Sequence, residues 1–229
     1  MSDIDTVILA GGLGTRLMPV LKDIPKCLAP INGRPFIDII LDNCIDQGLQ
    51  RFIICVGYLK EQVIEYLRDR NDCEIVFAKE EELLGTGGAL KNAEKYLTSD
   101  QFLVLNGDTF VKINYNRLID WHRKINSFLT MVINYSNNTS RYGSVRVDKN
   151  SKIIKFVEKD ESSKTGWVNA GGYLMNKAIL KKIAAGANVS LEKDLFLDCL
   201  GEDFFGFKNQ RQMIDIGIPA SYKKAQKRL

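Results

Sequence analysis

A glycine-rich segment followed by two cations is the strongest chemical signal in this sequence. Residues 9–35 read LAGGLGTRLMPVLKDIPKCLAPINGRP, so an apolar run ends at clustered glycines and is followed by Arg16 and Lys26. Glycine leaves backbone N–H groups unshielded by side chains, and such groups bind anions. Two cations beside the loop favour a polyphosphate over a single carboxylate as the ligand.

Other chemistries fit the sequence poorly. The dinucleotide pattern G-x-G-x-x-G is absent because Leu17 stands where the third glycine belongs, and the P-loop pattern does not occur. With a single histidine, His122, and no G-x-S-x-G string, a nucleophile triad is not expected. Zinc is not expected either, because no cysteine cluster accompanies that histidine. We expect His122 at the surface, since it stands in a polar helical stretch.

Strands and helices alternate through the first part of the chain. The periodicity predicts, in order, strand Val7–Ala10, helix Pro35–Gln47, strand Arg51–Val56, helix Glu61–Arg68, strand Glu74–Ala78, helix Gly87–Leu97 and strand Phe102–Leu105. This alternation predicts a parallel sheet covered by helices. Ligands of such sheets bind beyond the carboxyl ends of the strands, which makes Gly11-Gly12 and Gly107-Asp108 expected neighbours.

The pattern changes after about residue 129. Strands are expected at Thr130–Tyr135, Ser144–Val147, Ile153–Glu158 and Trp167–Met175, and helices at Ser190–Leu200 and Pro219–Leu229. We expect these strands to continue the sheet and to add an antiparallel part. The predicted fold is a single α/β domain over residues 1–229, Rossmann-like, with a mixed, mainly parallel sheet and helices on both faces.

Composition argues against several classes of protein. With 229 residues, 45% of them hydrophobic and 26% charged, the chain has the make-up of a soluble globular domain. A net charge of +4 is too mild to indicate a nucleic-acid partner, and no apolar run is long enough to cross a bilayer. Five cysteines without a C-x-x-C pair, and no basic leader before an apolar stretch, favour reduced thiols in the cytoplasm.

The longer pattern around the first loop resembles the signature of sugar-1-phosphate nucleotidylyltransferases. It reads G-G-x-G-x-R-L-x-P and then P-K-x-L-x-P-x-x-G-x-P, and the resemblance extends from Ile4 to about Arg228. It implies the nucleotide-diphospho-sugar transferase fold, with about residues 1–128 binding the nucleotide and about residues 129–229 binding the sugar. It also implies that a sugar phosphate oxygen attacks the nucleoside triphosphate directly.

The resemblance implies a nucleotide site made from two glycine-rich loops. Arg16 would grip the β- and γ-phosphates, and Lys26 would touch the reacting phosphates. The stretch Glu82–Leu90 (ELLGTGGAL) resembles the family's base and ribose loop, and a helix cap at Thr86 is the structural alternative. The candidate nucleotide-binding residues are Leu9, Gly11, Gly12, Gly14, Thr15, Gly85, Thr86 and Asn106.

Two carboxylates are the metal ligands that the resemblance implies. Asp108 follows an apolar strand, and Asp215 stands between Ile214 and Ile216. Mg²⁺ binds through one or two carboxylates together with phosphates and waters, so it is the expected cofactor. A turn or cap at a strand end is the alternative for each aspartate. The implied catalytic residues are Arg16, Lys26 and Asp108.

Three short motifs resemble, in chain order, the sugar site of the family. They are Tyr142-Gly143, Glu158-Lys159 and Asn169-Ala170-Gly171-Gly172. In this resemblance Lys159 would hold the sugar phosphate, while Glu158 would accept hydrogen bonds from sugar hydroxyls. The candidate sugar-phosphate residues are Gly143, Glu158, Lys159, Asn169, Gly171 and Glu192, and an exposed helix face explains Glu192 almost as well.

Within the family, the strings P-K-C-L-A-P-I-N-G-R-P-F and I-D-I-G-I-P-x-x-Y resemble the short branch that makes GDP-heptose from GTP and D-glycero-α-D-manno-heptose 1-phosphate. Met18, Val20 and Leu21 depart from the R-P-L-T of many relatives, which leaves base choice open. The alternatives are a uridylyl- or thymidylyltransferase acting on a hexose 1-phosphate, and a non-catalytic regulatory module.

No left-handed β-helix extension is evident, so we expect a simple enzyme. The expected partners are a nucleoside triphosphate and a sugar 1-phosphate, without nucleic acid or membrane, and a homo-oligomer stays open.

Overall fold

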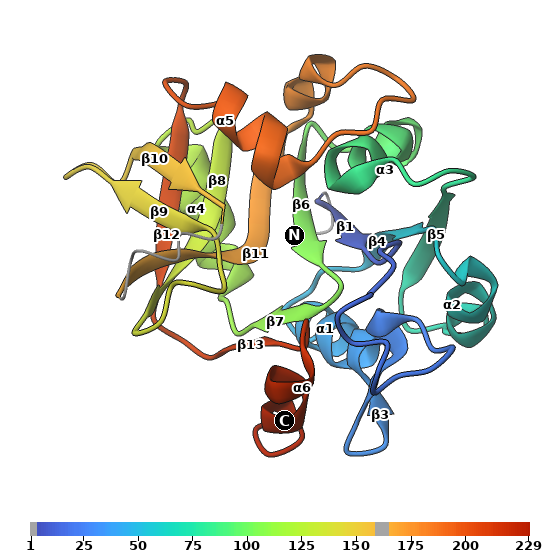
Figure 1. Cartoon of the computed structure of the whole chain (residues 1–229). Coiled ribbons are helices and arrows are strands. Elements are labelled where there is room, and N and C mark those ends of the chain that lie inside the picture. The colour runs from blue at the N-terminus through green and yellow to red at the C-terminus, as the bar shows by residue number, and fades with distance from the viewer. Residues whose placement is uncertain (1–3, 159–164) are drawn as a thin grey trace.

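A mixed nine-stranded sheet organises the part of the chain that the computed structural model describes, residues 4–158 and 165–229 (Figure 1). The strand order is β10-β9-β11-β6-β1-β4-β5, with β8 beside β11 and β12 beside β8. These strands are β1 (Asp5–Leu9), β4 (Arg51–Val56), β5 (Glu74–Lys79), β6 (Gln101–Asn106), β8 (Leu129–Ser136), β9 (Ser144–Val147), β10 (Ile153–Val157), β11 (Gly166–Asn176) and β12 (Phe204–Asn209).

The first part of the sheet is parallel, as predicted. Strand β1 pairs in parallel with β4 and with β6, and β4 pairs in parallel with β5. Leu9 at the end of β1 is opposite Asn106 at the end of β6. The loops that begin at Ala10 and Gly107 therefore leave the same edge of the sheet, and the Gly107 N–H donates to the Leu9 carbonyl at 3.0 Å.

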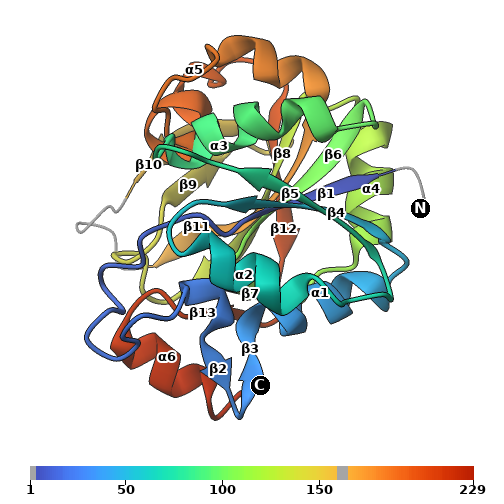
Figure 2. The ribbon, with the colours of Figure 1, turned by 90° about the vertical axis from the view of Figure 1, so that its right-hand side faces the viewer.

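Helices bury both faces of this parallel part. Helices α1 (Phe36–Ile45) and α2 (Lys60–Leu67) lie on one face, and α3 (Gly85–Ala93) lies on the other (Figure 2). Alternate residues of the strands join two separate cores: Ile8 belongs to the core with α1, and Val7 to the core with α3. Burial on both faces explains why these strands read as continuous apolar runs rather than as alternating patterns.

The second part of the sheet is antiparallel and centres on β11. This strand pairs antiparallel with β6, β8 and β9. Its pairing with β8 shifts register between Asn169 and Tyr173, where the Gly171 backbone adopts a positive φ of 75°. The irregularity lies on the segment that carries two of the predicted sugar-site residues, and bulges of this kind re-aim side chains near functional sites.

Two small sheets complete the edge at which the loops meet. Strand β13 (Met213–Asp215) pairs antiparallel with β7 (Thr109–Val111), which places Asp215 opposite Thr109. A second hairpin joins β2 (Pro30–Ile31) to β3 (Arg34–Pro35). Helix α6 (Pro219–Ala225) begins at Pro219, as predicted, and ends before the expected Leu229.

Two sequence predictions were wrong, one about a helix and one about a side chain. The helix expected over Ser190–Leu200 is a π-helical turn, Leu191–Leu195, followed by the short α5 (Phe196–Asp198). Helix α4 (Tyr115–Lys124) carries His122, which is fully buried rather than at the surface, with its Nδ1 2.8 Å from the Thr130 Oγ1. The buried residues of α4 are Tyr115, Leu118, Ile119 and His122, and the polar residues between them masked this narrow buried face in the sequence.

All five cysteines lie in the described residues, and none of them forms a disulfide. Within residues 4–158 and 165–229, none of the helices is both long enough and apolar enough to cross a membrane.

Candidate active site

The glycine loop after β1 lies against the neighbouring strand ends with almost no spare room. A Cβ on Gly11 would lie 2.7 Å from the Glu80 Oε1 and 3.0 Å from the Gly57 N, so a side chain there would collide. A Cβ on Gly12 would meet nothing within 4 Å. Gly14 needs its glycine for another reason, since its φ of +60° is strained for residues with a side chain. The loop therefore combines one steric and one conformational requirement for glycine.

Three adjoining hollows open at this edge, with volumes of about 570, 330 and 220 Å³. Arg16 and Asp108 line all three. The largest adjoins the loops of Gly11 and Gly85, and the second adjoins Gly143 and Glu158. The predicted nucleotide and sugar residues thus face one continuous cavity, with Arg16 and Asp108 where its parts meet.

Lys26 and Asp108 form an ion pair inside this cavity. Desolvation in the cavity raises the pKa of Asp108. The Lys26 ammonium, the Thr109 hydroxyl and the more distant Arg16 lower this pKa, and together they outweigh desolvation, so the net shift is downward. Asp108 is therefore a carboxylate at neutral pH, and Lys26 presents its charge beside it. The site can accept both a cation and the oxygens of a phosphate.

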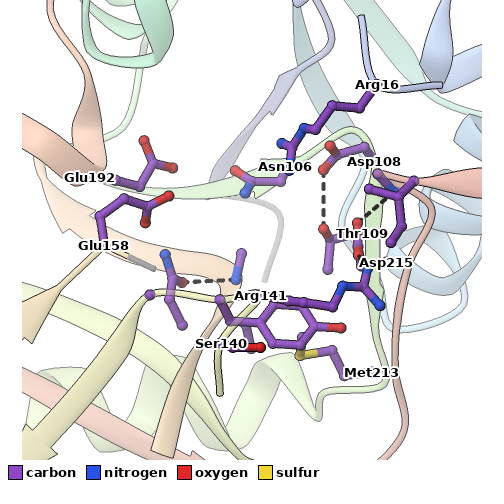
Figure 3. A pocket seen from close by; sticks show the side chains of 17 residues that line it. Arg16, Asn106, Asp108, Thr109, Ser140, Arg141, Glu158, Glu192, Met213 and Asp215 are labelled. Atoms are coloured by element: carbon purple, nitrogen blue, oxygen red, sulfur yellow. Dashed lines mark hydrogen bonds and ion pairs between the residues drawn. The ribbon is translucent and has the colours of Figure 1, made fainter. Parts of the chain in front are cut away.

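Asp215 reaches the same place from a distant part of the chain. Its Oδ1 accepts from the Gly217 N–H at 2.6 Å, and its Oδ2 accepts from the Arg141 guanidinium at 2.7 Å. Burial and the negative charge of Asp108 raise the pKa of Asp215, against the opposing effects of Gly217, Lys26 and Arg141. The two acids predicted as a pair line the same hollow (Figure 3).

The carboxylates of this cavity determine which kind of metal ion it suits. Among residues 4–158 and 165–229 no group of three or more histidine, cysteine, aspartate or glutamate side chains forms a site for a metal ion. The available donor set is the pair Asp108 and Asp215, which suits an ion that draws its remaining ligands from phosphates and waters.

The predicted sugar residues line the second hollow from the antiparallel side. The Asn169 side chain is already oriented, because its Oδ1 accepts from the Gly171 N–H at 2.9 Å and its Nδ2 donates to the Tyr173 hydroxyl at 2.7 Å. A Cβ on Gly143 would lie 2.7 Å from the Phe156 ring, so the backbone there is held close. Glu158 and Glu192 face the cavity together (Figure 3). Lys159 lies outside the described residues.

Comparison with known proteins matches this arrangement to one family. The family profile of nucleotidyl transferase matches residues 5–228. The chain belongs to the nucleotidyl transferase family. D-glycero-α-D-manno-heptose 1-phosphate guanylyltransferase of Aneurinibacillus thermoaerophilus is 36% identical to it over 98% of both chains. The enzyme of the same name from Campylobacter jejuni is 38% identical over 94% of this chain and 96% of the relative.

A solved structure supports the fold of this nucleotidyl transferase. HddC from Yersinia pseudotuberculosis matches with a TM-score of 0.88 and 38% identity, over 98% of this chain and 99% of that one. A second structure of the same protein, in complex with GMP-PN, matches equally well. The predicted single-domain α/β fold is therefore confirmed.

Two residues of this nucleotidyl transferase that line the cavity escaped sequence analysis. Glu80 follows β5, is 6% exposed and accepts from the Leu84 N–H at 3.1 Å, and its burial raises the pKa of its carboxyl. It was hidden as one of three consecutive glutamates, and the end of the preceding strand was the only available signal. Arg141 stands directly before the Tyr142-Gly143 motif, and no pattern distinguished it from a surface arginine.

The loop at Gly85 is tied to the opposite side of the cavity. The Thr86 hydroxyl donates to the Glu192 Oε2 at 3.0 Å and accepts from the Leu191 N–H at 2.8 Å. The N-cap of α3 is Leu84, without a side-chain cap, so the alternative that Thr86 caps this helix is wrong. Thr86 instead joins a predicted nucleotide loop to a predicted sugar residue.

Proposed function

We propose that this chain is a guanylyltransferase that converts GTP and D-glycero-α-D-manno-heptose 1-phosphate into GDP-heptose and pyrophosphate, for the synthesis of surface polysaccharide. The observation that carries the proposal is the single cavity in which the glycine loop, Lys26 and two carboxylates adjoin the predicted sugar residues. Both relatives named above are guanylyltransferases for this heptose phosphate. The GMP-PN complex of the similar HddC supports a nucleotide partner.

The reaction is a substitution at the α-phosphorus of GTP. A phosphate oxygen of the sugar 1-phosphate forms a bond to that phosphorus, the bond to the bridging oxygen of the β-phosphate breaks, and pyrophosphate leaves with the electron pair. No covalent enzyme intermediate is needed, so the chain has to align the reactants and stabilise the departing charge. In this proposal the backbone N–H groups of Gly11, Gly12 and Gly14, with the nearby Leu9 and Thr15, bind the polyphosphate. Arg16 neutralises the leaving pyrophosphate, and Lys26 contacts the reacting phosphates.

Nucleotidyl transferases of this family typically use a divalent metal ion, and we propose Mg²⁺ here. Asp108 and Asp215 would hold it, because they are two carboxylates lining one hollow beside the proposed phosphate site. When bound, the ion neutralises phosphate charge during transfer.

Glu80 supports guanine as the base. Its buried carboxylate faces the hollow beside Gly11 and Gly85, where the base would lie. A carboxylate only accepts hydrogen bonds, and guanine offers adjacent N1–H and N2–H donors. Uracil and thymine flank their single N–H with two carbonyl oxygens, which a carboxylate repels. In the same hollow, the Asn106 Oδ1 is a buried acceptor without a partner among the described residues, and it suits a ribose hydroxyl.

On the sugar side, Glu158 and Glu192 would accept from sugar hydroxyls, and the backbone at Gly143 and Gly171 would allow close approach. Lys159 is retained as a proposed ligand of the sugar phosphate. Heptose in particular rests on the names of the relatives. A division of labour between residues 1–128 and 129–229, a cytoplasmic location and a homo-oligomer remain predictions.

Pyrophosphate release tests the proposal. The purified chain is incubated with Mg²⁺ and each pairing of GTP, ATP, CTP, UTP or dTTP with heptose, mannose, glucose or N-acetylglucosamine 1-phosphate. Release confined to GTP with the heptose phosphate, and abolished by a chelator, is the expected result. Release with another pair keeps the chemistry and overturns the substrates. No release from folded protein, together with no metal-dependent GTP binding by calorimetry, would favour the regulatory module instead.

A further inference from the structure

Each of the two carboxylates at the centre of the cavity holds one cation. Asp108 pairs with Lys26, which belongs to the predicted phosphate machinery. Asp215 pairs with Arg141, to which neither the motifs nor the proposed mechanism gives a role. The two pairs come from four separate segments of the chain, yet they lie in one cavity lined by Arg141, Asp108 and Asp215 together (Figure 3). The second pair therefore requires an explanation.

Both oxygens of the Asp215 carboxylate are engaged while Arg141 is bound. Its Oδ1 is engaged by the Gly217 N–H, and its Oδ2 by Arg141 at 2.7 Å, with the Ser221 hydroxyl at 3.5 Å. The Asp215 side chain is only 14% exposed, so it has little water to replace a lost partner. A metal ion that binds Asp215 must therefore lie beside the Arg141 guanidinium, and the two cations compete for one poorly solvated carboxylate.

Arg141 is placed so that it can leave. It lies in the segment 137–143 between β8 and β9, and its side chain is 32% exposed. Its remaining contact of note is with the ring of the adjacent Tyr142, at 5.6 Å from the ring centre. A long side chain on a connecting loop can reorient at low cost, since no strand pairing has to break.

We propose that Arg141 holds Asp215 while the site is free of metal and moves to the phosphate of the sugar 1-phosphate when a divalent ion takes the carboxylate. Arg141 lies in the same hollow as Gly143 and Glu158, where the sugar is proposed to bind. The planar guanidinium fits two phosphate oxygens as it fits a carboxylate. Arg141 is thus a catalytic residue in addition to those that the motifs identify.

One consequence follows for the order of events. The exchange leaves no charge unpaired: the ion replaces Arg141 on Asp215, and the sugar phosphate replaces Asp215 on Arg141. Metal binding therefore strengthens the binding of the sugar phosphate, and the sugar phosphate strengthens the binding of the metal by the same factor. This inference rests on the proposed function for the identity of the phosphate, but the competition between Arg141 and metal does not.

The experiment compares Arg141→Gln and Arg141→Lys with the wild-type chain. Mn²⁺ binding without substrates is measured from free Mn²⁺ by electron paramagnetic resonance, and KM and kcat are measured by pyrophosphate release. We expect Arg141→Gln to bind Mn²⁺ about threefold more tightly, because a competing cation is gone. Its KM for the sugar 1-phosphate should rise by about 10- to 100-fold, while its KM for GTP stays within about twofold. Arg141→Lys should recover part of the KM effect.

Arg146→Gln is the matched control, because Arg146 is exposed on β9 and lines none of the three hollows. It should match the wild type in every measurement. Unchanged, weaker or undetectable Mn²⁺ binding in Arg141→Gln would overturn the competition, and an unchanged KM for the sugar 1-phosphate would overturn the phosphate contact. A lower melting temperature with equal changes in both KM values would identify a merely structural arginine.

A failure of the proposed function can be distinguished from a failure of the proposal about Arg141. If the wild type releases no pyrophosphate with any pair, the Mn²⁺ comparison still decides whether Arg141 competes with metal. Calorimetric binding of the sugar 1-phosphate in the presence of Mn²⁺ then replaces KM.

Discussion

The two sides of the cavity present different parts of the chain to it. On the side of β1 and β6 the lining includes the loop glycines Gly11, Gly12 and Gly14, and Gly11 lies so close to Gly57 that a methyl group would collide. On the side of β11 the lining includes polar side chains, such as Asn169 and Glu158. Backbone groups suit a ligand part common to all nucleotides, the polyphosphate. Side chains can differ between relatives, so we infer that the antiparallel side determines which sugar is used.

The largest effect is expected where the two sides meet, at Asp108. Asp108→Asn removes a proposed metal ligand and the carboxylate that pairs with Lys26. We expect kcat to fall by about 10³-fold, since preorganised charge in such sites contributes effects of this size. Pyrophosphate release measures it, with Asp120→Asn on the exposed face of α4 as the control. A decrease of less than about tenfold would show that neither side depends on this carboxylate.

Glu80 is a side chain on the side of β1 and β6, among the loop glycines. It therefore tests whether side chains or backbone groups on that side select the base. Glu80→Gln replaces an acceptor by a group that also donates, so we expect kcat/KM for GTP to fall by about 10²-fold and the preference for GTP over UTP to narrow. The neighbouring Glu81, whose side chain is 84% exposed, provides the control Glu81→Gln. An unchanged ratio of GTP to UTP would assign base choice to backbone groups alone.

Gly11 and Gly12 are neighbours, but only Gly11 lacks room for a side chain. Gly11→Ala should lower the free energy of unfolding by about 2 kcal/mol, because its Cβ would lie 2.7 Å from Glu80 and 3.0 Å from the Gly57 backbone. Gly12→Ala has open space and should change it by less than about 0.5 kcal/mol. Urea denaturation without nucleotide measures both. Equal losses would mean that the loop relaxes freely, and the tight backbone lining would then be a weak feature.

The smallest expected effect is a change in the pH dependence of stability at His122, which is buried and lines none of the three hollows. Burial lowers the pKa of His122 to about 4, so the folded chain resists a proton that the unfolded chain accepts near pH 6.5. Stability is complete above pH 6.5 and is lost as the pH falls toward 4. From pH 7 to 5.5 we expect His122→Asn to lose about 1 kcal/mol less than the wild type, by urea denaturation at each pH. Identical pH profiles would contradict the depressed pKa.

Sequence reasoning predicted the parallel part of the fold well because each strand there is an unbroken apolar run. Strand β4 was predicted with both of its ends, and the helix expected at Pro35–Gln47 is α1, which buries Phe36, Ile37, Ile40, Leu41 and Cys44. Strands β7 and β13 were not predicted, because three-residue strands carry no periodicity. The π-helical turn at Leu191 also has no sequence signature, and its shape depends on contacts with Thr86.

The site residues also divide into those with a sequence signal and those without one. The glycines and Lys26 lie in one continuous motif, so their meeting could be expected from sequence. Glu80 and Arg141 could not be picked out from the sequence, since nothing in the neighbouring residues separates them from other charged side chains. Their place in the cavity follows from the strands β5 and β8 that precede them, and only the three-dimensional arrangement brings them to Gly11 and Asp215.

The pairing of β13 with β7 has a consequence for the newly made chain. Asp215 reaches Asp108 only through this pairing, in which the Ile216 N–H also donates to the Asp108 carbonyl at 3.0 Å. A ribosome completes the glycine loop, Lys26 and Asp108 long before it adds Asp215. A nascent chain can therefore fold its parallel strands early, yet it has no complete pair of carboxylates until translation has passed residue 215. Under the proposed mechanism, an unfinished chain would lack one of the two carboxylates that hold the metal ion.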